Sequence, residues 1–285
     1  MKKFVAYIIC IAALGLISTG CQKTIDDDTA GAGRLVVEGW IDSGGHPTVI
    51  LTRSFSPMTT DATTLADLVV RWANVTISDG EHTETMIGRI DKDVTPPFVY
   101  TTAQITGVPG RTYTITAEYD GISVTSSCTM PQRPQIVRVD VTPVENIDTL
   151  REVSVTFVPG TNGERYYQLS VYDPSLSGRV LPCFMGTYCA AGDAGTREVT
   201  VTVCRPNIDT DENDYTPYFR VGRTITVSLN TLDADVWEFW HQYDDVIAFG
   251  GNIFLAGNVP LSGNISGGYG VWNARGADSR TLTVE

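Results

Sequence analysis

The sequence predicts a mainly β fold, and three observations carry that prediction. From Arg34 onward, apolar and polar residues alternate with a period of two, and the apolar ones are rich in β-branched and aromatic types. Clusters of Gly, Pro, Asn and Asp interrupt these stretches at the spacing of short strands. One segment, residues 234–249, has helical spacing instead. The pattern fits two antiparallel β-sandwich domains of Ig-like or fibronectin-like character, with one amphipathic helix in the second.

The composition indicates a folded, acidic chain. Of its 285 residues, 42% are hydrophobic and 19% are charged, which excludes an intrinsically disordered polymer. Lys and Arg number 20 against 33 Asp and Glu, giving a formal net charge of −13. Nucleic acid would be repelled at long range, so no nucleic-acid partner is expected.

Residues 1–20 have the pattern of a lipoprotein signal peptide. Lys2 and Lys3 precede an uncharged run over residues 4–17, which is shorter than the roughly 20 apolar residues of a spanning helix. Residues 17–21, ISTGC, resemble a bacterial lipobox, in which small residues precede a lipid-bearing cysteine. We therefore expect Cys21 to anchor the mature chain by lipid in the outer membrane. An ordinary signal peptide is the alternative.

Residues 21–33 are too poor in apolar side chains to fold and are expected to form a flexible acidic tether. Its Asp26, Asp27 and Asp28 resemble the acidic export signal that sends Bacteroidetes-type lipoproteins to the cell surface. A solvated acidic linker is the alternative. Removal of Lys2 and Lys3 with the signal leaves 18 basic residues against 33 acidic ones, a net charge of −15.

The first sandwich domain is predicted over residues 34–131. Strands are expected at residues 35–41, 48–52 and 75–78. The clearest hairpin covers residues 112–128, because Asp120-Gly121 suits a type I′ turn. That turn places Tyr119 opposite Ile122 and Tyr113 opposite Cys128, with Cys128 on the buried face.

The second domain is predicted over residues 134–285, after a connector bracketed by Pro131 and Pro134. Strands are expected near residues 136–142, 153–157, 166–172, 199–204 and 224–232, with a final pair near 269–272 and 281–284. The helix at 234–249 is amphipathic, and Asp233 or Thr231 is suited to cap its N-terminus.

Four cysteines remain in the folded part, and an oxidising compartment would let disulfides persist. Cys183 and Cys189 lie in a long excursion over residues 174–197, and Cys204 ends the strand that follows it. One bridge among these three is expected, with Cys128 left as a buried thiol.

A metal site is the weakest of the chemical expectations. Asp209, Asp211 and Asn213 occupy the first three odd positions of a calcium-loop pattern, but the glycine and the bidentate glutamate of that pattern are missing. A solvated acidic turn is the alternative. The three histidines are scattered, and we expect them to be exposed. No cofactor is expected.

The predicted binding face lies at one end of the second domain. Three long loops, at residues 174–197, 205–222 and 250–267, are expected to converge there beside the helix. Trp237, which flanks the apolar stripe of the helix, and Asp214 in the acidic turn are the expected ligand or partner contacts.

Several stretches together resemble the Bacteroidetes surface lipoprotein family called domain of unknown function 4249. They are RLVVEGWI (34–41), VTISDG (75–80), GVPGRTY (107–113), LDADVWEFW (232–240) and NISGGYGV (264–271). Members of that family are commonly encoded near TonB-dependent receptors, which implies a part in nutrient uptake at the cell surface. The resemblance brings no catalytic residues.

These observations predict a non-enzymatic surface lipoprotein of the outer membrane, accessory to TonB-dependent nutrient uptake through ligand capture or as a partner of the receptor. A surface adhesin or structural module is the alternative. A glycan or peptide hydrolase is the second alternative, because a catalytic pair among scattered carboxylates leaves no mark in a sequence.

Overall fold

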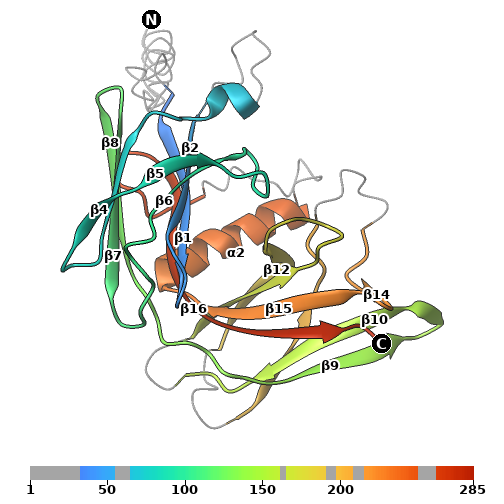
Figure 1. Cartoon of the computed structure of the whole chain (residues 1–285). Helices are drawn as coiled ribbons and strands as arrows, with labels where there is room; N and C mark the ends of the chain where they lie inside the picture. Colours follow the sequence, from blue (N-terminus) through green and yellow to red (C-terminus); the bar gives the residue numbers. More distant parts are fainter. Residues whose placement is uncertain (1–32, 55–64, 161–164, 191–196, 208–214, 250–260) are drawn as a thin grey trace, which may run out of the picture. The chain divides into compact units, whose positions relative to one another are not determined.

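A computed structural model describes residues 33–54, 65–160, 165–190, 197–207, 215–249 and 261–285 (Figure 1). The described part belongs to one compact unit, Arg34–Glu285. The predicted lipidation site Cys21 and most of the tether lie outside the described residues, as do Asp209, Asp211, Asn213 and Asp214.

The unit is mainly β, as predicted. Its strands are β1 (Leu35–Asp42), β2 (Thr48–Arg53), β3 (Asn74–Ser78), β4 (Thr83–Thr85), β5 (Ile87–Ile90), β6 (Phe98–Thr101), β7 (Thr112–Tyr119), β8 (Ile122–Thr129), β9 (Ile136–Val144), β10 (Ile147–Phe157), β11 (Tyr166–Tyr172), β12 (Leu181–Cys189), β13 (Val199–Val203), β14 (Phe219–Arg220), β15 (Thr224–Thr231) and β16 (Tyr269–Thr283). The helices among the described residues are a 3-10 turn, η2 (Leu65–Leu68), and α2 (Ala234–Phe249).

One large sheet runs through the whole unit. Its eight strands follow the order β12-β11-β15-β16-β1-β2-β6-β5. Two four-stranded sheets accompany it: β4-β3-β7-β8, and β13-β10-β14 with β9 also paired to β10. Neighbouring strands are antiparallel except β1 and β16, which pair in parallel.

Strand β16 joins the two halves of the large sheet. Its first part pairs with β1, from Val36 opposite Tyr269 onward, and its second part pairs with β15. The predicted final pair of strands at residues 269–272 and 281–284 is therefore wrong, because both belong to this single strand. Polar residues in its middle, such as Asn273 and Arg275, made that stretch look like a loop in the sequence.

Two large hydrophobic cores and a small cluster of Ile50, Val94 and Val99 pack against the large sheet. The first lies between it and β3, β7 and β8, and the second lies between it and β9, β10 and β13. The predicted boundary at residues 131–134 falls between Met130, buried in the first core, and Ile136, buried in the second. The chain returns to the first core later, since Val236 and Trp272 are also buried there.

The predicted hairpin is confirmed in its register. Tyr119 lies opposite Ile122 and Tyr113 opposite Cys128. Asp120 has a φ of 51° and Gly121 a φ of 78°, as a type I′ turn requires. Tyr113 and Cys128 are buried in the first core, so the turn chemistry and the alternation of the strands agree.

The predicted helix is also confirmed, over Ala234–Phe249. Asp233 occupies the N-cap position, since its carbonyl accepts the N–H of Trp237 at 2.9 Å, as in the first bond of a helix, and its Oδ1 accepts the N–H of Ala234 at 2.7 Å. The helix packs on β11, β12 and β16 (Figure 1). Among the helices in the described ranges, none is both long and apolar enough to cross a membrane.

The expected loop over residues 174–197 is wrong over Leu181–Cys189, which form β12. This strand pairs with β11, but the pairing shifts between Gln168 and Ser170, and Met185 has a φ of 50°. Such an irregularity breaks the alternation of buried and exposed side chains by which strands are recognised in a sequence.

Candidate functional site: an arginine-lined pocket

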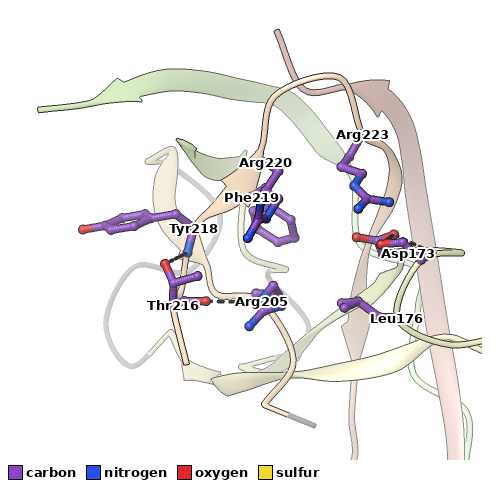
Figure 2. A pocket seen from close by; sticks show the side chains of 9 residues that line it. Asp173, Leu176, Arg205, Thr216, Tyr218, Phe219, Arg220 and Arg223 are labelled. Atoms are coloured by element: carbon purple, nitrogen blue, oxygen red, sulfur yellow. Dashed lines mark hydrogen bonds between the residues drawn. The ribbon is translucent and has the colours of Figure 1, made fainter. Parts of the chain in front are cut away.

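A cavity of about 380 Å³ opens beside the second core, where β14 leads into β15 (Figure 2). Three segments form its walls. They are the turn after β11, which begins at Asp173, the chain at Arg205 just after β13, and residues 216–223, which include β14. The side chains that give it its character are those of Asp173, Leu176, Arg205, Tyr218, Arg220 and Arg223.

Asp173 organises the first wall. Its Oδ1 accepts hydrogen bonds from the backbone N–H of Ser175 at 2.8 Å and from the Ser175 hydroxyl at 2.7 Å. Its backbone carbonyl accepts the N–H of Leu176 at 2.9 Å. The buried carboxylate therefore shapes the turn, and Figure 2 shows the guanidinium of Arg223 pointing toward it.

Arg205 is held at the second wall by the chain that leads into β14. Its Nε donates to the carbonyl of Thr216 at 3.2 Å, and its guanidinium carbon lies 5.9 Å from the centre of the Tyr215 ring. The Tyr215 hydroxyl donates to the carbonyl of Arg205 at 2.8 Å. Burial raises the pKa of Tyr215, so this hydroxyl keeps its proton and stays a donor.

Arg220 and Arg223 come from the third wall. Phe219, which is buried in the second core, fixes β14 against β10, and Arg220 is its exposed neighbour. Gly222, with a φ of 83°, lets the chain turn tightly, and its N–H donates to the carbonyl of Val284 at 2.7 Å. Within the described ranges, neither the Arg220 nor the Arg223 guanidinium has an ion-pair partner.

The charge of the pocket is opposite to that of the chain. Three of only 20 basic residues meet here, with one carboxylate among the lining side chains, in a protein of net charge −13. A guanidinium presents parallel N–H donors that match a carboxylate, phosphate or sulfate group. The arrangement is therefore suited to holding an anion.

Trp237, an expected ligand contact, does not line this pocket. It is half-buried on α2, where its ring stacks on that of His241 at 4.6 Å and tilts against Tyr166 at 5.2 Å. The other expected contact, Asp214, lies outside the described residues, as do the candidate metal ligands Asp209, Asp211 and Asn213. The described residues hold no cluster of three or more potential metal-ligating side chains.

The expectation of an exposed histidine is wrong for His241. Its Nδ1 lies 3.3 Å from the hydroxyl of Thr187 on β12, and that hydroxyl donates to Oδ2 of Asp244 at 2.8 Å. Burial raises the pKa of Asp244, although Thr187 partly offsets this effect. Because Thr187 lies on β12 while His241 and Asp244 lie on α2, these contacts attach the helix to the sheet.

The four described cysteines are free thiols, so no pair among Cys183, Cys189 and Cys204 is bonded in the structure. Cys183 and Cys189 both lie on β12, on either side of its irregular stretch: Cys189 pairs with Tyr166, and Pro182, next to Cys183, pairs with Ser170. Burial raises the pKa of Cys183 and Cys204, and it raises that of Cys128 to about 12. Such thiols are poor nucleophiles.

A comparison with models of protein families shows the family of the chain. The model of the family described as domain of unknown function (DUF4249) matches residues 22–281. The chain belongs to this family. No curated protein matches the sequence. The arginine pocket, between Asp173 and Arg223, lies within the part of the chain that matches DUF4249.

Sequence reasoning missed the three arginines of this DUF4249 protein, because single exposed arginines are ordinary on a protein surface. One signal was present: Arg205, Arg220 and Arg223 fall within 19 residues of a chain that has few basic residues. The sequence does not show that Asp173 lies near these arginines, because only the folded chain brings the end of β11 to the pocket.

Proposed function

We propose that this protein is a non-enzymatic binding lipoprotein of the outer-membrane surface, and that its arginine pocket holds the anionic group of a ligand taken up by a TonB-dependent receptor. The observation that carries the proposal is the meeting of Arg205, Arg220 and Arg223 around one cavity of an acidic protein.

The size and lining of the pocket indicate the class of ligand. Its volume of about 380 Å³ is at the lower end of the range of small-molecule sites, about 300–1,000 Å³. Leu176 and Phe219 offer apolar surface beside the cations (Figure 2). A small carboxylate, phosphate or sulfate ester with a partly apolar body would use both features.

The proposed location of the protein at the outer-membrane surface is inferred from its N-terminal residues. A lipid on Cys21 would fix the protein to the membrane, and the acidic tether would let the folded unit reach a receptor beside it. In the same proposal the two cores are two Ig-like or fibronectin-like sandwich domains that share β16, with the pocket on the second.

Calorimetric titration of the full mature chain with citrate, inorganic phosphate and sulfate tests the pocket. We expect at least one of these anions to bind, and Arg220→Gln and Arg223→Gln each to weaken that binding about ten-fold, since each removes a charge-assisted donor. Arg53→Gln is the matched control, because Arg53 is exposed at the end of β2. Absence of binding by all three anions, or equal weakening by the control, would contradict the pocket's role.

A further inference from the structure

A second cavity, of about 390 Å³, lies in the first half of the chain beside the turn between β7 and β8. One of its walls is Trp72, a residue that is 88% exposed, whereas Trp272 in the first core is 0% exposed. Single exposed hydrophobic residues are ordinary, but this ring lines a hollow that two carboxylates line as well. The combination is that of a binding site.

The hollow is acidic. Glu118 and Asp120 line it, and none of its lining residues is basic. Arg71 precedes Trp72 in the chain but does not line the cavity. Glu118 Oε2 accepts the side-chain amide of Asn74 at 3.2 Å, and the backbone of Asp120, with a φ of 51°, belongs to the type I′ turn.

We infer that this hollow receives an arginine side chain presented by a partner protein. A guanidinium stacks on the face of a tryptophan more favourably than on other rings, and its donors at the same time reach carboxylates. Glu118 and Asp120 supply that complementary charge beside Trp72. A lysine ammonium would meet the charge but not the planar stacking.

The exposure of Trp72 identifies the source of the arginine as a protein. Because Trp72 is 88% exposed, its ring offers one wall to a guest, whereas sites for free small molecules bury most of the ligand's surface. A partner protein can cover the remaining surface around the ring, which is how exposed tryptophans become central contacts of interfaces. This site is independent of the arginine pocket and carries the opposite charge.

The test uses the full mature chain and two peptides that differ in one charge: acetyl-Gly-Arg-Gly-amide and the same peptide with citrulline, the uncharged isostere of arginine. Binding is followed by calorimetry and by tryptophan fluorescence. We expect the arginine peptide to bind and the citrulline peptide to bind at least about three-fold more weakly.

Three variants assign the binding to the hollow. Trp72→Ala should weaken binding of the arginine peptide about three-fold or more, whereas Trp72→Phe should retain part of it. The double variant Glu118→Gln with Asp120→Asn removes both charges, but it keeps the bond from Asn74 and suits the turn, so it should lose binding without a lower melting temperature.

Three results with the peptides would overturn the inference. They are equal binding of the two peptides, unchanged binding by Trp72→Ala, and no binding of the arginine peptide up to its solubility limit. Choline serves as a free cation. If it bound as tightly as the arginine peptide, a small ammonium ion and not a protein's arginine would be the guest. Because Trp72→Ala leaves the net charge unchanged, attraction of the peptide to the acidic surface in general does not mimic the expected loss.

Discussion

Arg275 binds Asp42 through two hydrogen bonds, from Nε to Oδ1 at 2.6 Å and from Nη2 to Oδ2 at 3.0 Å. The two residues are 233 positions apart in the chain and face each other in the parallel pair of β1 and β16. Their side chains are 15% and 39% exposed. The pair therefore joins the first strand to the last within the large sheet.

We expect Arg275→Lys to lower the free energy of unfolding by roughly 1 kcal/mol, because lysine keeps the charge but cannot make both bonds. Urea unfolding followed by circular dichroism measures it. Arg89→Lys is the control, since Arg89 makes one bond to Asp91 at 2.9 Å on the surface and should change stability by less than about 0.5 kcal/mol. Equal effects of the two changes would contradict a special role for the bidentate pair.

Gly39 on β1 is required by the close approach of Trp272. A Cβ at this position would lie 2.8 Å from Cε3 of the Trp272 ring. Gly39→Ala should therefore cost about 1–3 kcal/mol of stability through overpacking. Gly45→Ala, whose Cβ would meet no atom closer than 3.4 Å, is the control in the same thermal-unfolding experiment. An unchanged melting temperature for Gly39→Ala would show that the first core repacks freely around Trp272.

The ionisation of Asp79 makes the free energy of unfolding depend on pH in the acidic range. The backbone N–H of His82, followed by that of Glu81 and the guanidinium of Arg111, lowers its pKa to about 2, although its partial burial works in the opposite direction. Since the folded pKa is below the unfolded value of 3.8, this contribution to stability is complete above about pH 4 and is lost as the pH falls toward 2. Asp79→Asn should flatten the decline of the urea midpoint over that window. An equally steep decline in both proteins would assign it to other carboxylates.

Cys21→Ser should release the protein from the membrane fraction or leave its signal peptide uncleaved, because serine cannot carry the thioether-linked lipid. Cell fractionation and the mass of the mature chain measure this. A variant with serine at position 21 that stays in the outer membrane at its normal mature mass would contradict the lipobox.

Surface display is tested separately. In the unmodified protein, protease added to intact cells should remove the folded unit, and replacement of Asp26, Asp27 and Asp28 by alanine should protect it.

Local chemistry explains which parts of the fold could be predicted. The Asp120-Gly121 turn fixed the register of β7 and β8 through residues that are close in sequence, and Asp233 with the apolar spacing after it determined α2. The parallel pairing of Val36 with Tyr269 has no such signal, because no turn connects the two strands. An arrangement that depends on distant pairing cannot be found from alternation alone.

The candidate site was missed for the same reason. Arg220 and Arg223 are neighbours in sequence, but Asp173 reaches them only because β11 and β15 pair within the large sheet. Trp237 was predicted to contact a ligand because it flanks the apolar stripe of α2, yet its ring packs against Tyr166 and His241 once the helix lies on the sheet. Trp72, which has no partner of that kind among the described rings, is the exposed tryptophan instead.

The central claim is that this protein is a surface lipoprotein that binds a ligand and works with a transporter. Affinity purification of the tagged full-length protein from detergent-solubilised outer membranes tests this claim most directly. We expect a TonB-dependent receptor to co-elute in near-stoichiometric amount with the lipid-anchored protein, and to be lost when Cys21→Ser removes the anchor. Recovery of the lipoprotein without any receptor, from membranes in which the receptor is present, would contradict the proposed function.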